Sequence, residues 1–153
     1  MRLADVLTVE RVMIEAGALS KAELLRRMAR LFVGTDGRDA EDAAFLALLA
    51  REKLASTGVG SGVAIPHGRM AALDEMRAAV IVCPSGVDFD AIDSKPVTIA
   101  LGILAPERHT SDHLKALARI SRLLRDEQVR TTMIAARDPQ ALCDLIWRED
   151  SVH

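Results

Sequence analysis

Apolar residues recur at helical spacing in two segments of the first third of the chain. Ser20 and Glu23 form a capping box that opens the first segment, and residues 34–37, rich in glycine, close it. The second segment begins near Asp39, where acidic residues suit a helix start, and ends near Arg51–Leu54. The pattern predicts two helices. Their core-facing positions are expected to be Leu24, Leu25, Met28, Leu31 and Phe32 in the first, and Phe45, Leu46, Leu48 and Leu49 in the second.

Runs with strand character occupy the middle of the chain. Val97–Leu104 is apolar throughout, as expected of a strand at the centre of a sheet covered on both faces. Ala79–Cys83 has the composition of a buried strand that the turn residues 84–86 end, and Val87–Ile92 alternates like a short half-exposed strand. Shorter strands are expected at Val12–Glu15 and Val63–Ile65, and a turn or a single helical turn at Met70–Met76.

The last third of the chain again has helical spacing. Thr110 or Ser111 is expected to cap a helix whose core side carries Leu114, Leu117, Ile120, Leu123 and Leu124. A shorter helix is predicted at Asp126–Arg137, and Asp138 followed by Pro139 is a typical start for the final helix. Helices, then strands, then helices predict an α/β fold in which a mixed β-sheet is sandwiched between helices, with residues 1–153 forming a single domain.

Composition narrows the classes of function. A formal net charge of −2 argues against a nucleic-acid surface, which needs concentrated lysine and arginine. Lys21, Arg26, Arg27 and Arg30 share one predicted helix and are interpreted as its solvated face. The two cysteines lie in apolar segments, as buried reduced thiols do, and no apolar run reaches the length of a membrane span. With no leader pattern at the N-terminus, a cytoplasmic protein without membrane insertion is expected.

His67 is the first candidate for chemistry. It lies between Pro66 and Gly68, after a glycine-containing loop and the short strand Val63–Ile65. Proline fixes its own φ and glycine tolerates unusual angles, so the histidine is expected on a stiff corner at a strand end. A lone histidine is more often a satisfied polar group or a surface residue, and that alternative stays open. The glycines precede the strand and lack a Gly-Lys-Ser/Thr ending, which argues against a nucleotide loop.

Two further residues could complete an anion site. Arg51 is expected on the last turn of the helix that leads into the loop, and a guanidinium can bind two phosphate oxygens at once. His113 is expected in the first turn of the helix after the central strand, where the dipole favours anions and disfavours a protonated imidazole. Taken in isolation, each is more often an ordinary surface residue, and that alternative stays open. Together with His67 they form a candidate anion site.

A longer motif resembles a known family. Arg51-Glu-Lys, Ser56-Thr-Gly-Val-Gly60 and Ala64-Ile-Pro-His-Gly68 are similar to the phosphorylation motif of mannitol/fructose-type enzyme IIA domains of the bacterial phosphotransferase system. The resemblance spans residues 3–148 and includes Phe89-Asp-Ala-Ile-Asp93 and Thr110-Ser-Asp-His113. Within the family the chain most resembles the nitrogen-regulatory branch. Ser61 departs from some sugar-specific relatives, which have a carboxylate there.

The resemblance implies a phosphoryl carrier that works through a phosphohistidine intermediate. His67 would accept the phosphoryl group from a histidine-phosphorylated carrier protein of the HPr or NPr kind, and Arg51 and His113 would bind the phosphate. No metal or nucleotide cofactor is implied, and the output would be control of regulatory protein partners. The alternatives are a sugar-specific enzyme IIA that feeds a permease, an interaction module without phosphorylation, and, least favoured, a zinc site made by His67, His113 and a cysteine.

Overall fold

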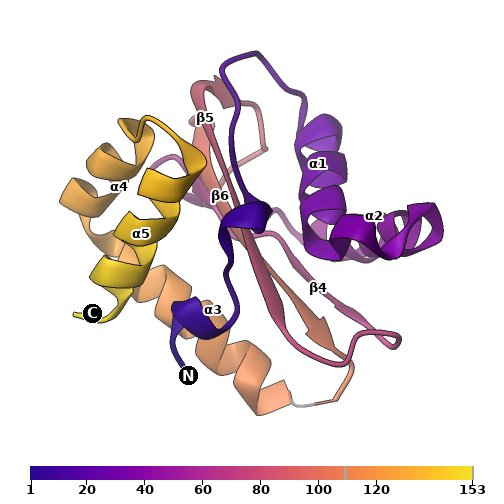
Figure 1. The fold of residues 1–153 in the computed structure, drawn as a ribbon. Coiled ribbons are helices and arrows are strands. Elements are labelled where there is room, and N and C mark those ends of the chain that lie inside the picture. The colour runs from indigo at the N-terminus through magenta and orange to yellow at the C-terminus, as the bar shows by residue number, and fades with distance from the viewer. Residues whose placement is uncertain (109, 153) are drawn as a thin grey trace.

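A computed structural model describes residues 1–108 and 110–152, which form a mixed sheet between two layers of helices (Figure 1). The strands follow the spatial order β1-β5-β6-β3-β2, and β4 pairs with β6 beyond the end of β3. β5 is antiparallel to β6, while β1 is parallel to β5, and β3 and β4 are parallel to β6. The strands are β1 (Val12–Ile14), β2 (Gly58–Gly60), β3 (Val63–Ala64), β4 (His67–Met70), β5 (Arg77–Val87) and β6 (Val97–Pro106).

The helices divide between the two faces of the sheet. The first two α-helices pack on one face of the sheet and the last three pack on the other (Figure 1). Each layer of helices buries a separate apolar cluster against the sheet. The α-helices are α1 (Lys21–Val33), α2 (Arg38–Leu54), α3 (Thr110–Arg125), α4 (Glu127–Ile134) and α5 (Pro139–Asp150), and short 3-10 turns are η1 (Leu3–Asp5), η2 (Val9–Arg11) and η3 (Gly34–Asp36). The predicted α/β fold, with its mixed sheet sandwiched between helices, is confirmed.

Three of the predicted helix starts are confirmed in atomic detail. Ser20 accepts a hydrogen bond from the backbone N–H of Glu23, and the Glu23 carboxylate returns one to the backbone of Ser20. Asp126 caps α4, and Asp138 caps α5 with Pro139 in its first turn. These contacts satisfy backbone donors that a helix start would otherwise leave unpaired.

A break in the edge strand sets the position of the candidate histidine. β3 and β4 run along the same side of β6, with Ala64 beside Ala100 and His67 beside Ile103. Between them, Pro66 has no N–H to donate, but its carbonyl accepts from the N–H of Ile103 at 3.0 Å. His67 therefore begins a new strand instead of standing on a corner where a strand ends, as the sequence had suggested.

Two strand predictions were wrong. β5 does not end at residue 83 but runs through Pro84 to Val87. The partner strand β1 stops opposite Val82, and the register with β6 shifts beyond that residue. The strand can therefore include a proline, because no ladder hydrogen bond requires an N–H at this position. Residues 88–92 form no strand. Instead Phe89 is fully buried in the core while Ile92 is exposed.

Two apolar side chains expected in the core lie at the surface. Leu46 on α2 is 63% exposed and Leu114 on α3 is 61% exposed, whereas Leu48 and Ile120 are buried as predicted. The basic residues of α1 form ion pairs with acidic side chains, so they do not make a free cationic surface: Lys21 pairs with Glu52, Arg26 and Arg30 with Glu41, and Arg27 with Glu15. None of the helices in the described residues has the length and apolarity needed to cross a membrane.

Candidate functional site

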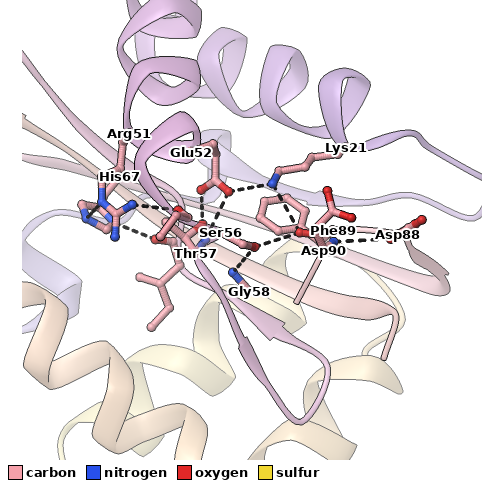
Figure 2. A network of polar contacts seen from close by, with 12 residues as sticks. Lys21, Arg51, Glu52, Ser56, Thr57, Gly58, His67, Asp88, Phe89 and Asp90 are labelled. Atoms are coloured by element: carbon pink, nitrogen blue, oxygen red, sulfur yellow. Dashed lines mark hydrogen bonds and ion pairs between the residues drawn. The ribbon is translucent and has the colours of Figure 1, made fainter. Parts of the chain in front are cut away.

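The three residues predicted to form an anion site meet at the edge of the sheet. His67 opens β4, Arg51 lies on the last turn of α2, and His113 lies in the first turn of α3. The rings of His67 and His113 are edge-to-face with centroids 5.6 Å apart. Arg51 Nε is 3.1 Å from His67 Nε2, and Figure 2 shows the arginine and this ring side by side. They border a cavity of about 460 Å³ whose other walls are Ala47, Ala50, Leu54, Gly68, Arg69, Leu114 and Leu117.

Hydrogen bonds select one tautomer of His67. Its Nδ1 is 2.8 Å from the carbonyl oxygen of Ile65, which can only accept, so Nδ1 carries the proton. Nε2 then keeps its lone pair and accepts from the Nε–H of Arg51. The nitrogen that faces the arginine is therefore the nucleophilic one.

The surroundings keep His67 neutral. Burial lowers the pKa of His67, the hydrogen bond to the Ile65 carbonyl opposes this by raising it, and the positive charge of Arg51 lowers it further. The net direction is below the ordinary histidine value. A neutral ring, in which Nε2 carries a lone pair, is the form that can attack phosphorus.

His113 is held by a residue that the sequence argument missed. The Nε–H of Arg69 donates to His113 Nδ1 at 3.3 Å, and Arg69 also donates to the Thr110 hydroxyl at 3.2 Å. Because Nδ1 accepts, the proton of the neutral ring is on Nε2, which is buried and has no hydrogen-bond partner in the described structure. A buried N–H without an acceptor is costly, so the binding of an anion that accepts its hydrogen bond is favoured.

Burial also keeps His113 neutral. The side chain is 4% exposed, and burial together with the nearby His67 and Arg69 lowers the pKa of His113 to about 4. At neutral pH the ring therefore offers an N–H without adding a positive charge.

Arg69 could have been found from the sequence by strand geometry. In a strand, alternate residues share one face, so a strand that begins at His67 places Arg69 beside it. The expectation of a corner at residues 66–68 concealed this relation. The site consequently has two guanidinium groups, those of Arg51 and Arg69, and two neutral imidazoles.

Close packing fixes the distance between α2 and β4. A Cβ on Gly68 would lie 3.2 Å from the Cβ of Ala47 and 3.3 Å from its backbone carbonyl. Ala47 is one helical turn before Arg51, so the missing side chain at Gly68 lets the arginine approach His67.

The described residues offer no group of three or more histidine, cysteine, aspartate or glutamate side chains that could hold a metal ion. Both cysteines, Cys83 and Cys143, are buried and unpaired, and burial raises the pKa of each thiol to about 11. Two guanidinium groups and an imidazole nitrogen with a lone pair line the same cavity, an arrangement that can bind an anion beside a nucleophile.

Known proteins resemble this chain in sequence and in fold. The family model described as "Phosphoenolpyruvate-dependent sugar phosphotransferase system, EIIA 2" matches residues 5–148. A nitrogen regulatory protein of Bradyrhizobium diazoefficiens is 38% identical over 95% of this chain and 95% of its own length. A fructose-specific EIIA component of a phosphotransferase system in Haloferax volcanii is 35% identical over 95% of this chain and 97% of its own.

A solved structure agrees with the sequence relatives. The crystal structure of the nitrogen regulatory protein IIA-Ntr from Neisseria meningitidis superposes with a TM-score of 0.86 at 30% identity, covering 94% of this chain and 98% of that one. The family model, the sequence relatives and the solved structure lead to the same assignment. The chain belongs to the EIIA 2 family of the phosphoenolpyruvate-dependent sugar phosphotransferase system.

Proposed function

We propose that this protein, as a single domain of residues 1–153, is a phosphoryl carrier of the nitrogen-related phosphotransferase system. His67 accepts a phosphoryl group from a histidine-phosphorylated carrier protein, and the phosphorylation state then controls regulatory partners in the cytoplasm. The observation that carries the proposal is the lone pair of His67 Nε2, which faces Arg51 at 3.1 Å in a cavity bordered by a second guanidinium.

The transfer step needs only groups of the two proteins. The lone pair of His67 Nε2 attacks phosphorus, an N–P bond forms, and the N–P bond in the donor breaks with its electron pair returning to the donor's imidazole. The proton on His67 Nδ1 stays in place, so the step needs no general base. The ring gains positive charge, and the Ile65 carbonyl 2.8 Å away stabilises that charge.

The phosphate-binding roles follow from charge and hydrogen bonding. In the free protein Arg51 occupies the lone pair of His67, so it must rotate onto the phosphoryl oxygens as the donor approaches. The buried Nε2–H of His113 supplies a further donor without added charge. Arg69 balances the nearly two negative charges that phosphorylation brings.

The carrier would dock on the rim of the same cavity. Leu54, 81% exposed at the end of α2, and Leu114, 61% exposed at the start of α3, flank the opening. Exposed leucines around a cationic cavity suit a partner that presents a phosphohistidine within an apolar surface.

Phosphorylation can be tested by intact-protein mass spectrometry with phosphoenolpyruvate, the first enzyme of the relay and the carrier. Wild type should gain one phosphoryl group that is labile to acid and stable to base, as phosphohistidine is. His67→Ala should gain none, and His153→Ala, a matched histidine control, should label like wild type. Labelling of His67→Ala at the wild-type level would refute the proposal.

One observation favours a second candidate, a sugar-specific enzyme IIA that feeds a permease. The relative from Haloferax volcanii is described as fructose-specific, and the match covers 97% of its length. Against it, Ser61 stands where some sugar-specific relatives have a carboxylate, and here it lies in the β2–β3 turn with its N–H bonded to Asp93 at 2.9 Å. Growth on fructose or mannitol of a strain lacking the corresponding IIA, restored by this chain, would support the sugar role.

A further inference from the structure

Glu52 is a buried carboxylate that the phosphoryl-transfer step does not use. It follows Arg51 on α2, but its side chain is 5% exposed and turns toward α1 and the loop after α2 (Figure 2). Lys21 Nζ lies 2.9 Å from one oxygen, the backbone N–H of Thr57 donates to the same oxygen at 3.1 Å, and the Thr57 hydroxyl donates to the other. A carboxylate is buried only when its oxygens are paired in this way.

Thr57 links Glu52 to the candidate nucleophile through backbone hydrogen bonds. Thr57 is 3% exposed, and its carbonyl accepts from the N–H of Ile65 at 3.0 Å. The carbonyl of the same Ile65 accepts from His67 Nδ1 at 2.8 Å. Glu52, Thr57, Ile65 and His67 are thus joined in series, and the last bond decides which nitrogen of the ring keeps the lone pair.

The same carboxylate ties this chain of bonds to the body of the fold. Lys21, its partner on α1, also donates to the carbonyl of Phe89 at 3.3 Å, and Ser56 donates to that carbonyl at 2.8 Å (Figure 2). Phe89 is fully buried beneath the ammonium, with Lys21 Nζ 4.5 Å from its ring centroid. The loop at residues 55–58 is therefore held from α1 and from the segment after β5, and Glu52 is the junction.

We propose that Glu52 is a positioning residue for His67: through Thr57 and Ile65 it holds the ring as the Nδ1–H tautomer, with the lone pair on Nε2. This inference rests on the proposed phosphoryl-carrier function and names a residue on which the rate of that function depends. It adds a role for the Ile65 carbonyl, because this oxygen faces the proton of a ring that becomes positive as the N–P bond forms.

The chain supplies a matched control for a lost ion pair. Glu41 lies on the same helix as Glu52 and pairs with Arg26 and Arg30 of α1, at 3.3 and 3.0 Å. Its side chain is 13% exposed, and none of its contacts reaches the loop at residues 55–58. Glu41→Ala therefore removes an α1–α2 ion pair without touching Thr57.

The first measurement is the tautomer of His67, read from ¹⁵N chemical shifts of the ring in the unphosphorylated protein. Wild type and Glu41→Ala should show the Nδ1–H tautomer alone. Glu52→Ala should show a mixture of tautomers, and Glu52→Gln, whose amide oxygen can still accept from Thr57, should restore the single form. If Glu52→Ala does not fold, Thr57→Val tests the same link, because it removes the hydroxyl that donates to Glu52 while the glutamate remains, and it should also show a mixture of tautomers.

The second measurement is the rate at which phosphoramidate phosphorylates the protein, which needs no carrier and so excludes docking effects. In this reaction the N–P bond of phosphoramidate breaks, ammonia leaves and the bond to His67 Nε2 forms. Partners that orient metal-ligating histidines contribute about ten- to a hundredfold, and by analogy Glu52→Ala should react on the order of tenfold more slowly. Glu52→Gln should recover most of that rate, and Glu41→Ala should match wild type.

Two results would overturn the role of Glu52: a single Nδ1–H tautomer with the wild-type rate in Glu52→Ala, or the same loss in Glu41→Ala. Failure of the proposed function looks different. In that case neither the carrier nor phosphoramidate labels wild-type His67, while the tautomer comparison among the variants still gives its answer.

Discussion

Lowering the pH should destabilise this protein through His113 before it protonates the surface carboxylates. The side chain is 4% exposed, its Nε2 has no partner in the described structure, and Arg69 donates to its Nδ1, so the folded protein resists protonation. The pKa of His113 falls from 6.5 in the unfolded chain to about 4 in the folded protein. The stability that this histidine contributes is therefore fully present above pH 6.5 and is lost as the pH falls toward 4.

The magnitude follows from the size of this shift. Each pKa unit corresponds to about 1.4 kcal/mol, so the whole shift is worth about 3 kcal/mol. Between pH 7 and pH 5 the folded protein should lose about 2 kcal/mol of unfolding free energy through this residue. The pKa of His67 is also lowered, which adds to the loss in the same direction.

Urea denaturation followed by circular dichroism at pH 7, 6 and 5 measures this dependence. His113→Gln cannot titrate in this range, so its unfolding free energy should fall less, and the difference from wild type should shrink by about 2 kcal/mol between pH 7 and pH 5. Arg69→Met removes a nearby positive charge and should raise the pKa of His113. The unfolding free energy of this variant should therefore depend less on pH than that of wild type. Parallel curves for wild type and His113→Gln, or titration of His113 near 6.5 by NMR, would refute the reasoning.

Three further substitutions test the geometry of the site. Arg51→Ala should slow phosphorylation of His67 on the order of a hundredfold in a quenched time course, because a preorganised donor to the phosphoryl oxygens is lost, and an unchanged rate would exclude that role. Gly68→Ala brings a methyl group to 3.2 Å from Ala47 and should force α2 away from β4, with about 1–3 kcal/mol less stability in urea and slower phosphorylation. Gly102→Ala would place its Cβ 2.6 Å from a methionine sulfur and from a proline carbonyl, so its melting temperature should fall well below that of wild type, and an unchanged value would contradict this packing.

Local signals explain most of what could be predicted about the fold. The capping box at Ser20 and Glu23 and the Asp138-Pro139 start act within a few residues, so their sequence patterns translate directly into structure. The apolar run of β6 likewise required burial on both faces of a sheet. The errors arose where a residue distant in sequence determines how long an element is. β5 continues through Pro84 because its neighbour β1 ends opposite Val82.

The candidate site likewise has a part that local sequence determines and a part that depends on tertiary structure. By itself the sequence determined the motif around His67 and the residue types, Arg51 and His113, that an anion site needs. Only the tertiary structure decided that β4 begins at His67, which brings Arg69 onto the same face, and that Glu52 turns away from the cavity to hold Thr57. The physical reason is that a tautomer and a lone pair depend on hydrogen bonds between segments whose meeting is set by sheet register and helix packing, and neither is written in local sequence.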